Sequence, residues 1–182
     1  MSVPVQVGTT AVEGVDSWSL GKVNDLLRGQ GLPEHLEPPA RPGGRKPGRA
    51  AADAVPGPWL QEFVQTEVAS GDDRTHLAAL NLPGSGFFLP RPMARPLRSA
   101  DGSTWIASSV GLLEELRQAA EGLDIPSFSD VLPDPVAAAI AAEEPLSESD
   151  EPSEWAEQRE VWLCLYEAAR ISVADGSVMW LG

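Results

Sequence analysis

The longest periodic segment of the chain lies near its C-terminal end and constrains the fold more than any other feature. Between Ser153 and Gly176 the apolar residues return at intervals of three, four or seven, which is the spacing of one face of an α-helix. Ser153 is the expected N-cap and Gly176 the expected C-terminal stop. A long helix of this kind buries its apolar stripe against other elements. The stripe consists of Trp155, Trp162, Leu165, Tyr166, Ala169 and Val173.

The rest of the chain alternates between helical and extended patterns without a regular order. Apolar spacing, caps and glycine stops predict helices over 19–28, 58–69, 110–120 and 134–144. Strands are expected over 76–82, 86–89, 104–107 and 177–181, with a hairpin turn at Asp101-Gly102. This mixed order favours an α+β fold, in which a small antiparallel sheet packs against about four to five helices. The length of 182 residues predicts a single domain.

A segment from 37 to 58 interrupts these patterns. Its 22 residues include six prolines, four glycines and four basic residues. Such a composition disfavours a helix or a central strand and predicts an extended, flexible linker. A second exposed segment, an acidic loop, is expected at about 143–153.

Charge is distributed very unevenly along the chain. The sequence has 27 acidic and 13 basic residues and a net charge of −14. Residues 1–100 are balanced, whereas residues 101–182 hold seventeen acidic residues and three basic ones. This excess argues against a protein whose whole surface binds nucleic acid or an anionic membrane. The acidic half is either a solvated face that maintains solubility or a docking surface for a cationic partner.

Residues with potential chemistry are few. The single cysteine, Cys164, excludes an internal disulfide framework and is expected in the core. Asp72 and Asp73 lie close to His76, and His35 lies next to Glu34, but neither group has the spacing of a metal site or a catalytic triad. No catalytic residue, cofactor or metal is therefore expected. The absence of an evident signal peptide or membrane span predicts a cytoplasmic protein.

These observations favour a non-catalytic, acidic protein-binding module. Its carboxylates would mimic phosphates, steer a basic partner such as a toxin or nuclease towards the surface, and block that partner's active site. Small acidic immunity proteins of bacteria have this general character, although no motif of theirs is matched residue by residue. The predicted binding residues are Glu143, Glu144, Glu148, Asp150, Glu151, Glu154, Trp155, Glu157 and Glu160.

Two other function classes remain open. A structural or assembly subunit of a bacterial or phage-like complex would use the 37–58 segment and the C-terminal strand for contacts. An enzyme with an unrecognised site would use His76, Asp72 and Asp73 first. The oligomeric state does not follow from the sequence.

Overall fold

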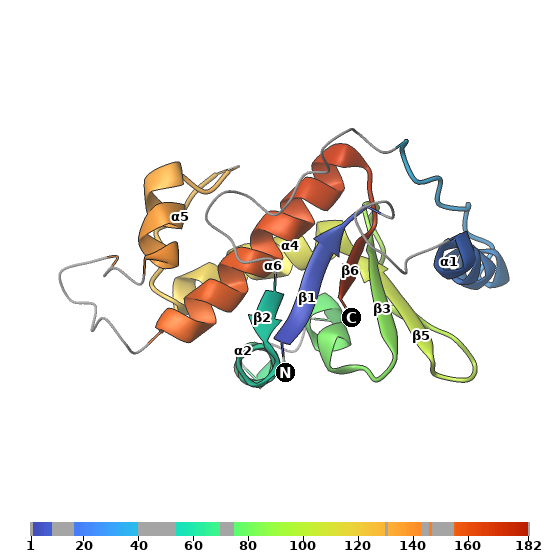
Figure 1. Ribbon diagram of the computed structural model, residues 1–182, viewed down its shortest axis with the longest axis horizontal. Helices are drawn as coiled ribbons and strands as arrows, with labels where there is room; N and C mark the ends of the chain where they lie inside the picture. Colours follow the sequence, from blue (N-terminus) through green and yellow to red (C-terminus); the bar gives the residue numbers. More distant parts are fainter. Residues whose placement is uncertain are drawn as a thin grey trace.

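The computed structural model describes residues 2–8, 17–39, 54–69, 75–129, 131–142, 146 and 155–181 (Figure 1). Within these ranges six helices and six strands follow one another with a short 3-10 turn. Their bounds are β1 Ser2–Val7, α1 Ser17–Gly29, β2 Ala54–Pro56, α2 Gly57–Ala69, α3 Thr75–Ala78, the 3-10 turn Ala79–Asn81, β3 Ser85–Leu89, β4 Leu97–Arg98, β5 Thr104–Ser108, α4 Ser109–Gly122, α5 Asp134–Ala141, α6 Ala156–Asp175 and β6 Met179–Leu181.

The six strands form one sheet in the order β2-β1-β6-β3-β5-β4. Helices and strands are mixed along the chain, so the α+β prediction is confirmed. The sheet, however, is mixed rather than antiparallel, because β3 and β5 run parallel and β5 inserts between β3 and β4. The proline-containing connection after β3 is long enough to return the chain to the start of β5, which a tight hairpin is not.

Two further elements differ from the prediction. Residues 75–81 form α3 and the 3-10 turn instead of a strand. A short apolar run does not distinguish the two by periodicity, and here the carboxylate of Glu115 accepts hydrogen bonds from the backbone amides of His76 and Leu77 at 3.0 and 2.7 Å. Strand β1 is not among the predicted elements, although Val3, Val5 and Val7 alternate as they do in a half-buried strand.

Helix α6 lies at the centre of the molecule and contacts α2, α4, α5 and one face of the sheet (Figure 1). Every side chain from Val161 to Ala169 is buried, so the expectation of one apolar stripe is wrong for these two turns. Val173, predicted on that stripe, is 37% exposed. Gly176 ends the helix in the left-handed conformation, as expected. The predicted cap, Ser153, lies outside the described residues, and Trp155 precedes the helix without a side-chain cap.

The opposite face of the sheet is covered by α1. A second buried cluster there joins Val23 and Leu27 of α1 to alternate sheet residues such as Phe87, Leu89 and Ile106. The extended segment of residues 32–39 is held by hydrogen bonds on the same side of the sheet as α1. Asn24 and His35 exchange two hydrogen bonds, and the carboxylate of Glu37 accepts from the backbone amide of Val178. Glu37, at the start of the predicted linker, is thus part of the packed structure.

The remainder of the predicted 37–58 linker divides into two parts. Residues 54–56 form the edge strand β2 and residues 57–58 begin α2, so the linker prediction is wrong at this end. Val55, which is fully buried, provides the apolar contact that the composition of the segment concealed. Residues 40–53 lie outside the described residues, and the single-domain organisation stays a prediction. No helix in the described ranges is long and apolar enough to cross a membrane.

Candidate functional site

The antiparallel packing of α4 and α6 brings acidic residues from distant parts of the sequence together. Trp162 Nε1 donates to the carbonyl oxygen of Leu116 at 2.7 Å, and the hydroxyls of Ser109 and Ser172 hydrogen-bond at 2.7 Å. At the far end, Arg159 Nε donates to the carbonyl oxygen of Leu123 at 2.8 Å. The C-terminal end of α4 therefore lies beside the N-terminal end of α6.

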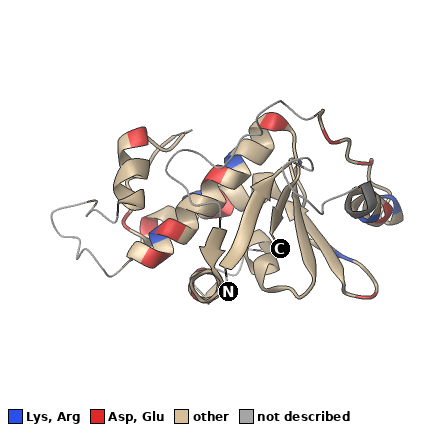
Figure 2. Cartoon of the chain, viewed as in Figure 1, with Lys and Arg blue, Asp and Glu red and all other residues tan. Residues whose placement is uncertain are grey.

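The two adjoining helix ends carry four carboxylates and are here called the acidic end: Glu121, Asp124, Glu157 and Glu160. Glu121 and Asp124 flank the Leu123 carbonyl, and Glu157 and Glu160 flank Arg159. Glu121, Asp124 and Glu157 are exposed and form no ion pair with another described residue. Figure 2 shows acidic residues gathered on the N-terminal half of α6 and on the elements beside it. Only Glu157 and Glu160 of this set were predicted.

Two of the three basic residues of the C-terminal half are engaged within the fold or in a local ion pair. Arg159 is 4% exposed and its guanidinium is directed into the fold, onto Leu123. Arg170 donates to the carboxylate of Glu167 at 2.6 Å, and this hydrogen bond raises the pKa of the Arg170 guanidinium, although burial opposes the shift. The cationic groups of Arg159 and Arg170 thus serve the structure, whereas the third basic residue, Arg117, is exposed on α4. Carboxylates outnumber exposed cations at the acidic end, which favours a negative local potential.

The position of Glu121 and Asp124 has no structural advantage. The C-terminal end of a helix carries a partial negative charge, so a carboxylate there is destabilising by about 0.3–1 kcal/mol. Asp124 also has a positive φ of 55°, a conformation that asparagine adopts as readily as aspartate. Glu157, by contrast, lies in the first turn of α6, where negative charge is favourable.

The other predicted binding residues have different outcomes. Trp155 is half-buried and packs against the main core, and its role in binding stays a prediction. The six carboxylates at 143, 144, 148, 150, 151 and 154 lie outside the described residues. Glu115 of α4 is only 7% exposed, and its carboxylate accepts hydrogen bonds from two backbone amides of α3.

The candidate catalytic residues have structural roles where they are described. His76 is 4% exposed; its Nε2 lies 3.1 Å from the carbonyl oxygen of Met93, and its Nδ1 accepts from the amide of Ser108 at 3.3 Å. His35 is buried and forms a 2.8 Å pair with Glu37. Cys164 is fully buried, as predicted. Asp72 and Asp73 lie outside the described residues. No group of three or more possible metal ligands occurs within the described ranges.

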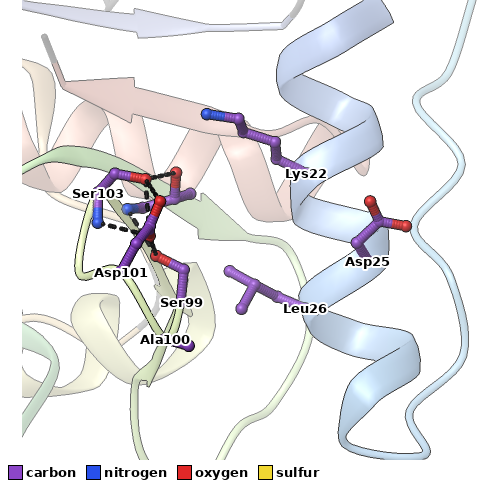
Figure 3. A pocket seen from close by; sticks show the side chains of 8 residues that line it. Lys22, Asp25, Leu26, Ser99, Ala100, Asp101 and Ser103 are labelled. Atoms are coloured by element: carbon purple, nitrogen blue, oxygen red, sulfur yellow. Dashed lines mark hydrogen bonds between the residues drawn. The ribbon is translucent and has the colours of Figure 1, made fainter.

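The shallow pockets of the described part of the molecule include two that lie away from the acidic end. One of about 370 Å³ separates α1 from the tip of the β4–β5 hairpin, towards which Lys22 and Leu26 extend (Figure 3). The polar groups of that tip are satisfied internally, because Asp101 accepts from Ser99 and Ser103. The other, of about 330 Å³, lies at the N-terminal end of α4. His76 does not line it and lies behind Gly111.

An α+β protein with exposed carboxylates at one end and fully engaged histidines has the character of an acidic protein-binding module. A family model described as "Putative DNA-mimic protein" matches residues 50–181, which is more than two thirds of the chain. The chain therefore belongs to this family of DNA-mimic proteins. No curated protein and no solved structure matches it.

Proposed function

We propose that this protein is a non-catalytic DNA mimic that occupies the DNA-contacting surface of a basic protein. The family match carries the proposal, because residues 50–181 contain 22 of the acidic residues and only seven of the basic ones. The matched region thus holds the entire negative excess of the chain. A protein that competes with DNA needs this excess, since phosphate contacts dominate the affinity of DNA-binding proteins.

The arrangement of the acidic end supports this function. Glu157 and Glu160 are separated by three residues, a rise of about 4.5 Å along a helix. Helices in contact lie about 8–10 Å apart, so α4 and α6 present two neighbouring groups of carboxylates on a rigid support. Fixed carboxylates reproduce the discrete charges of a nucleic acid backbone at little entropic cost.

The segment between Ala142 and Trp155 contributes six more carboxylates to the proposed surface. They belong to residues Glu143, Glu144, Glu148, Asp150, Glu151 and Glu154. The partner would therefore meet the acidic end together with this segment. Glu121 and Asp124 lie at the C-terminal end of α4, where the helix dipole disfavours negative charge. Selection for stability alone would not favour them there, which further supports a binding role.

The partner that we favour is a nuclease or a DNA-binding toxin, which would make this protein an immunity or inhibitor protein of the cytoplasm. A mimic of phosphates that covers a basic catalytic cleft excludes the substrate by occupying the same site. Association would be rapid, because complementary charges steer the two proteins together.

A displacement experiment tests the proposal. Proteins from a lysate of the source organism are loaded on double-stranded-DNA cellulose at low salt, and the purified chain is used to elute them. We expect the wild-type chain to release a defined set of DNA-binding proteins, whereas the variant Glu121→Gln/Asp124→Asn/Glu157→Gln releases at least about tenfold less at equal concentration. Each neutralised contact with a cationic group is worth about 1 kcal/mol or more when water is excluded.

A matched control variant carries Asp25→Asn, Glu34→Gln and Glu62→Gln. It raises the net charge by the same three units at exposed positions away from the acidic end. Asp25 and Glu34 pair with Arg28 at the surface, and such exposed pairs contribute little stability. The proposal is wrong if the wild-type chain releases nothing, or if both variants release the same amount.

A further inference from the structure

Helix α5 is almost entirely apolar, yet four of its eight residues are exposed and only one is fully buried. Its sequence is Asp-Pro-Val-Ala-Ala-Ala-Ile-Ala, and Ile140 is its only buried residue. A helix that is apolar on all sides is normally buried in a core. Here α5 makes its main contact with α6 alone (Figure 1).

The exposed side of α5 continues into the residues before it. Val131 is 58% exposed, the second most exposed large hydrophobic residue in the described ranges. Pro133, Pro135, Ala138 and Ala141 are also exposed. We call these five residues the α5 face. Exposed apolar residues that gather in one short segment of a monomer typically mark an interaction site.

The charges around the α5 face restrict what can cover it. Asp134 begins the helix, and Ala142 leads directly into Glu143 and Glu144. Helix α6, on which α5 packs, presents Glu157 and Glu160 from its N-terminal end. An anionic lipid surface and the same end of a second copy are both repelled by this charge. A cationic protein is attracted.

We infer that the α5 face is the apolar anchor of the interface, and that the DNA-binding partner places an apolar patch, surrounded by basic residues, upon it. The inference rests on the proposed function and adds to it. The interface would then have an apolar centre that excludes water and a rim of carboxylates, which is the usual anatomy of a protein–protein binding site. DNA itself offers apolar thymine methyl groups between its phosphates, so a surface of this kind fits a protein that reads the major groove.

The test changes the α5 face without changing any charge. The variant Val131→Thr/Ala138→Gln/Ala141→Gln introduces polar groups at exposed positions, and glutamine is a good helix former. Its matched control, Val173→Thr/Ala174→Gln/Ala69→Gln, places the same substitutions at exposed positions of α6 and α2. Circular dichroism confirms that both variants retain the fold.

The probe is the protein fraction that wild-type chain releases from double-stranded-DNA cellulose. We expect the α5 variant to need at least about tenfold more protein for half-maximal release, because buried polar groups weaken the centre of an interface. The control should match the wild type. Equal release by the α5 variant and the control would overturn the inference.

The outcomes separate this inference from the proposed function. If wild-type chain releases no protein, the proposed function fails and the inference fails with it. If wild-type chain releases protein, the charge variant does not, and the α5 variant behaves as the wild type, only the inference is overturned. Sedimentation velocity provides a further check: a wild-type dimer that the α5 variant converts to a monomer would assign the face to self-association and overturn the inference.

Discussion

At the scale of single residues, the tip of the β4–β5 hairpin shows how local hydrogen bonds determine a charge. Asp101 accepts from the hydroxyls of Ser99 and Ser103 at 2.6 and 2.9 Å and from the backbone amide of Ser103 at 3.0 Å. The side-chain hydrogen bond from Ser99, followed by those from Ser103, lowers the pKa of the Asp101 carboxyl to about 2 from its ordinary value of 3.8. Asp101 is thus a turn residue and not a catalytic acid.

This geometry predicts a pH dependence. Because the pKa of Asp101 is lowered on folding, its ionised form stabilises the hairpin above the ordinary pKa, and this contribution is lost as the pH falls through the folded value. We expect the Asp101 carboxyl signal in a carbon NMR titration to have a midpoint of about 2 in the wild type. The variant Ser99→Ala should have a higher midpoint, because the largest cause of the shift is removed. A wild-type midpoint at 3.8 would contradict this account.

Residue patterns in the sequence separate core from surface well, but they do not identify buried polar partners. Cys164 and Trp162 were correctly expected in the core. Glu115 was not, because its burial depends on the amides of His76 and Leu77, which are 38 or more positions away in the chain. A carboxylate that binds backbone amides looks the same in a sequence as one in water.

At the scale of elements, sequence patterns predict where helices lie but not how segments distant in the sequence pack together. Periodicity located α2, α4 and α6, because each buries an apolar face. It did not reveal that α4 and α6 are antiparallel neighbours, and so it did not place Glu121 and Asp124 beside Glu157. The parallel pairing of β3 with β5 was missed for the same reason, since the residues of a strand do not specify which neighbour they pair with.

Helix α4 offers a prediction about close packing between elements. A Cβ added at Gly111 would lie 2.1 Å from the His76 ring, whereas one at Gly122 would meet nothing within 4 Å. His76 cannot move easily, because both of its ring nitrogens are engaged. We expect Gly111→Ala to destabilise the protein by about 1–3 kcal/mol through overpacking, although alanine is the better helix former.

The matched substitution on the same helix is Gly122→Ala. It should leave the free energy of unfolding unchanged or raise it by up to about 1 kcal/mol. Urea denaturation followed by circular dichroism measures both values. Equal free energies of unfolding for the two variants would contradict this prediction. They would mean that the His76 ring can move away from a Cβ at position 111.

At the scale of the whole molecule, the distribution of charge relative to DNA determines how the two compete. Duplex DNA carries one charge per about 1.7 Å of its axis and condenses counterions. This chain carries fewer charges than a DNA duplex of similar size, and its charges are distributed over a folded surface. It therefore condenses fewer counterions than the DNA does. The complex of a partner with DNA therefore loses more affinity as salt rises than the complex of the same partner with this chain.

The resulting prediction concerns competition at different ionic strengths. A partner that makes six to ten phosphate contacts loses about 10³–10⁵ in DNA affinity between about 50 and 200 mM salt. The apolar α5 face is insensitive to screening, so the affinity for this chain should decline much less. We expect the concentration of chain required for half-maximal release from DNA cellulose to fall as salt is raised across this range, after subtraction of the release caused by salt alone. For the α5 variant this fall in the required concentration should be mostly lost, and for the charge variant it should be lost to a smaller extent. A required concentration that rises with salt would mean that binding relies on charge alone, with no apolar centre to the interface.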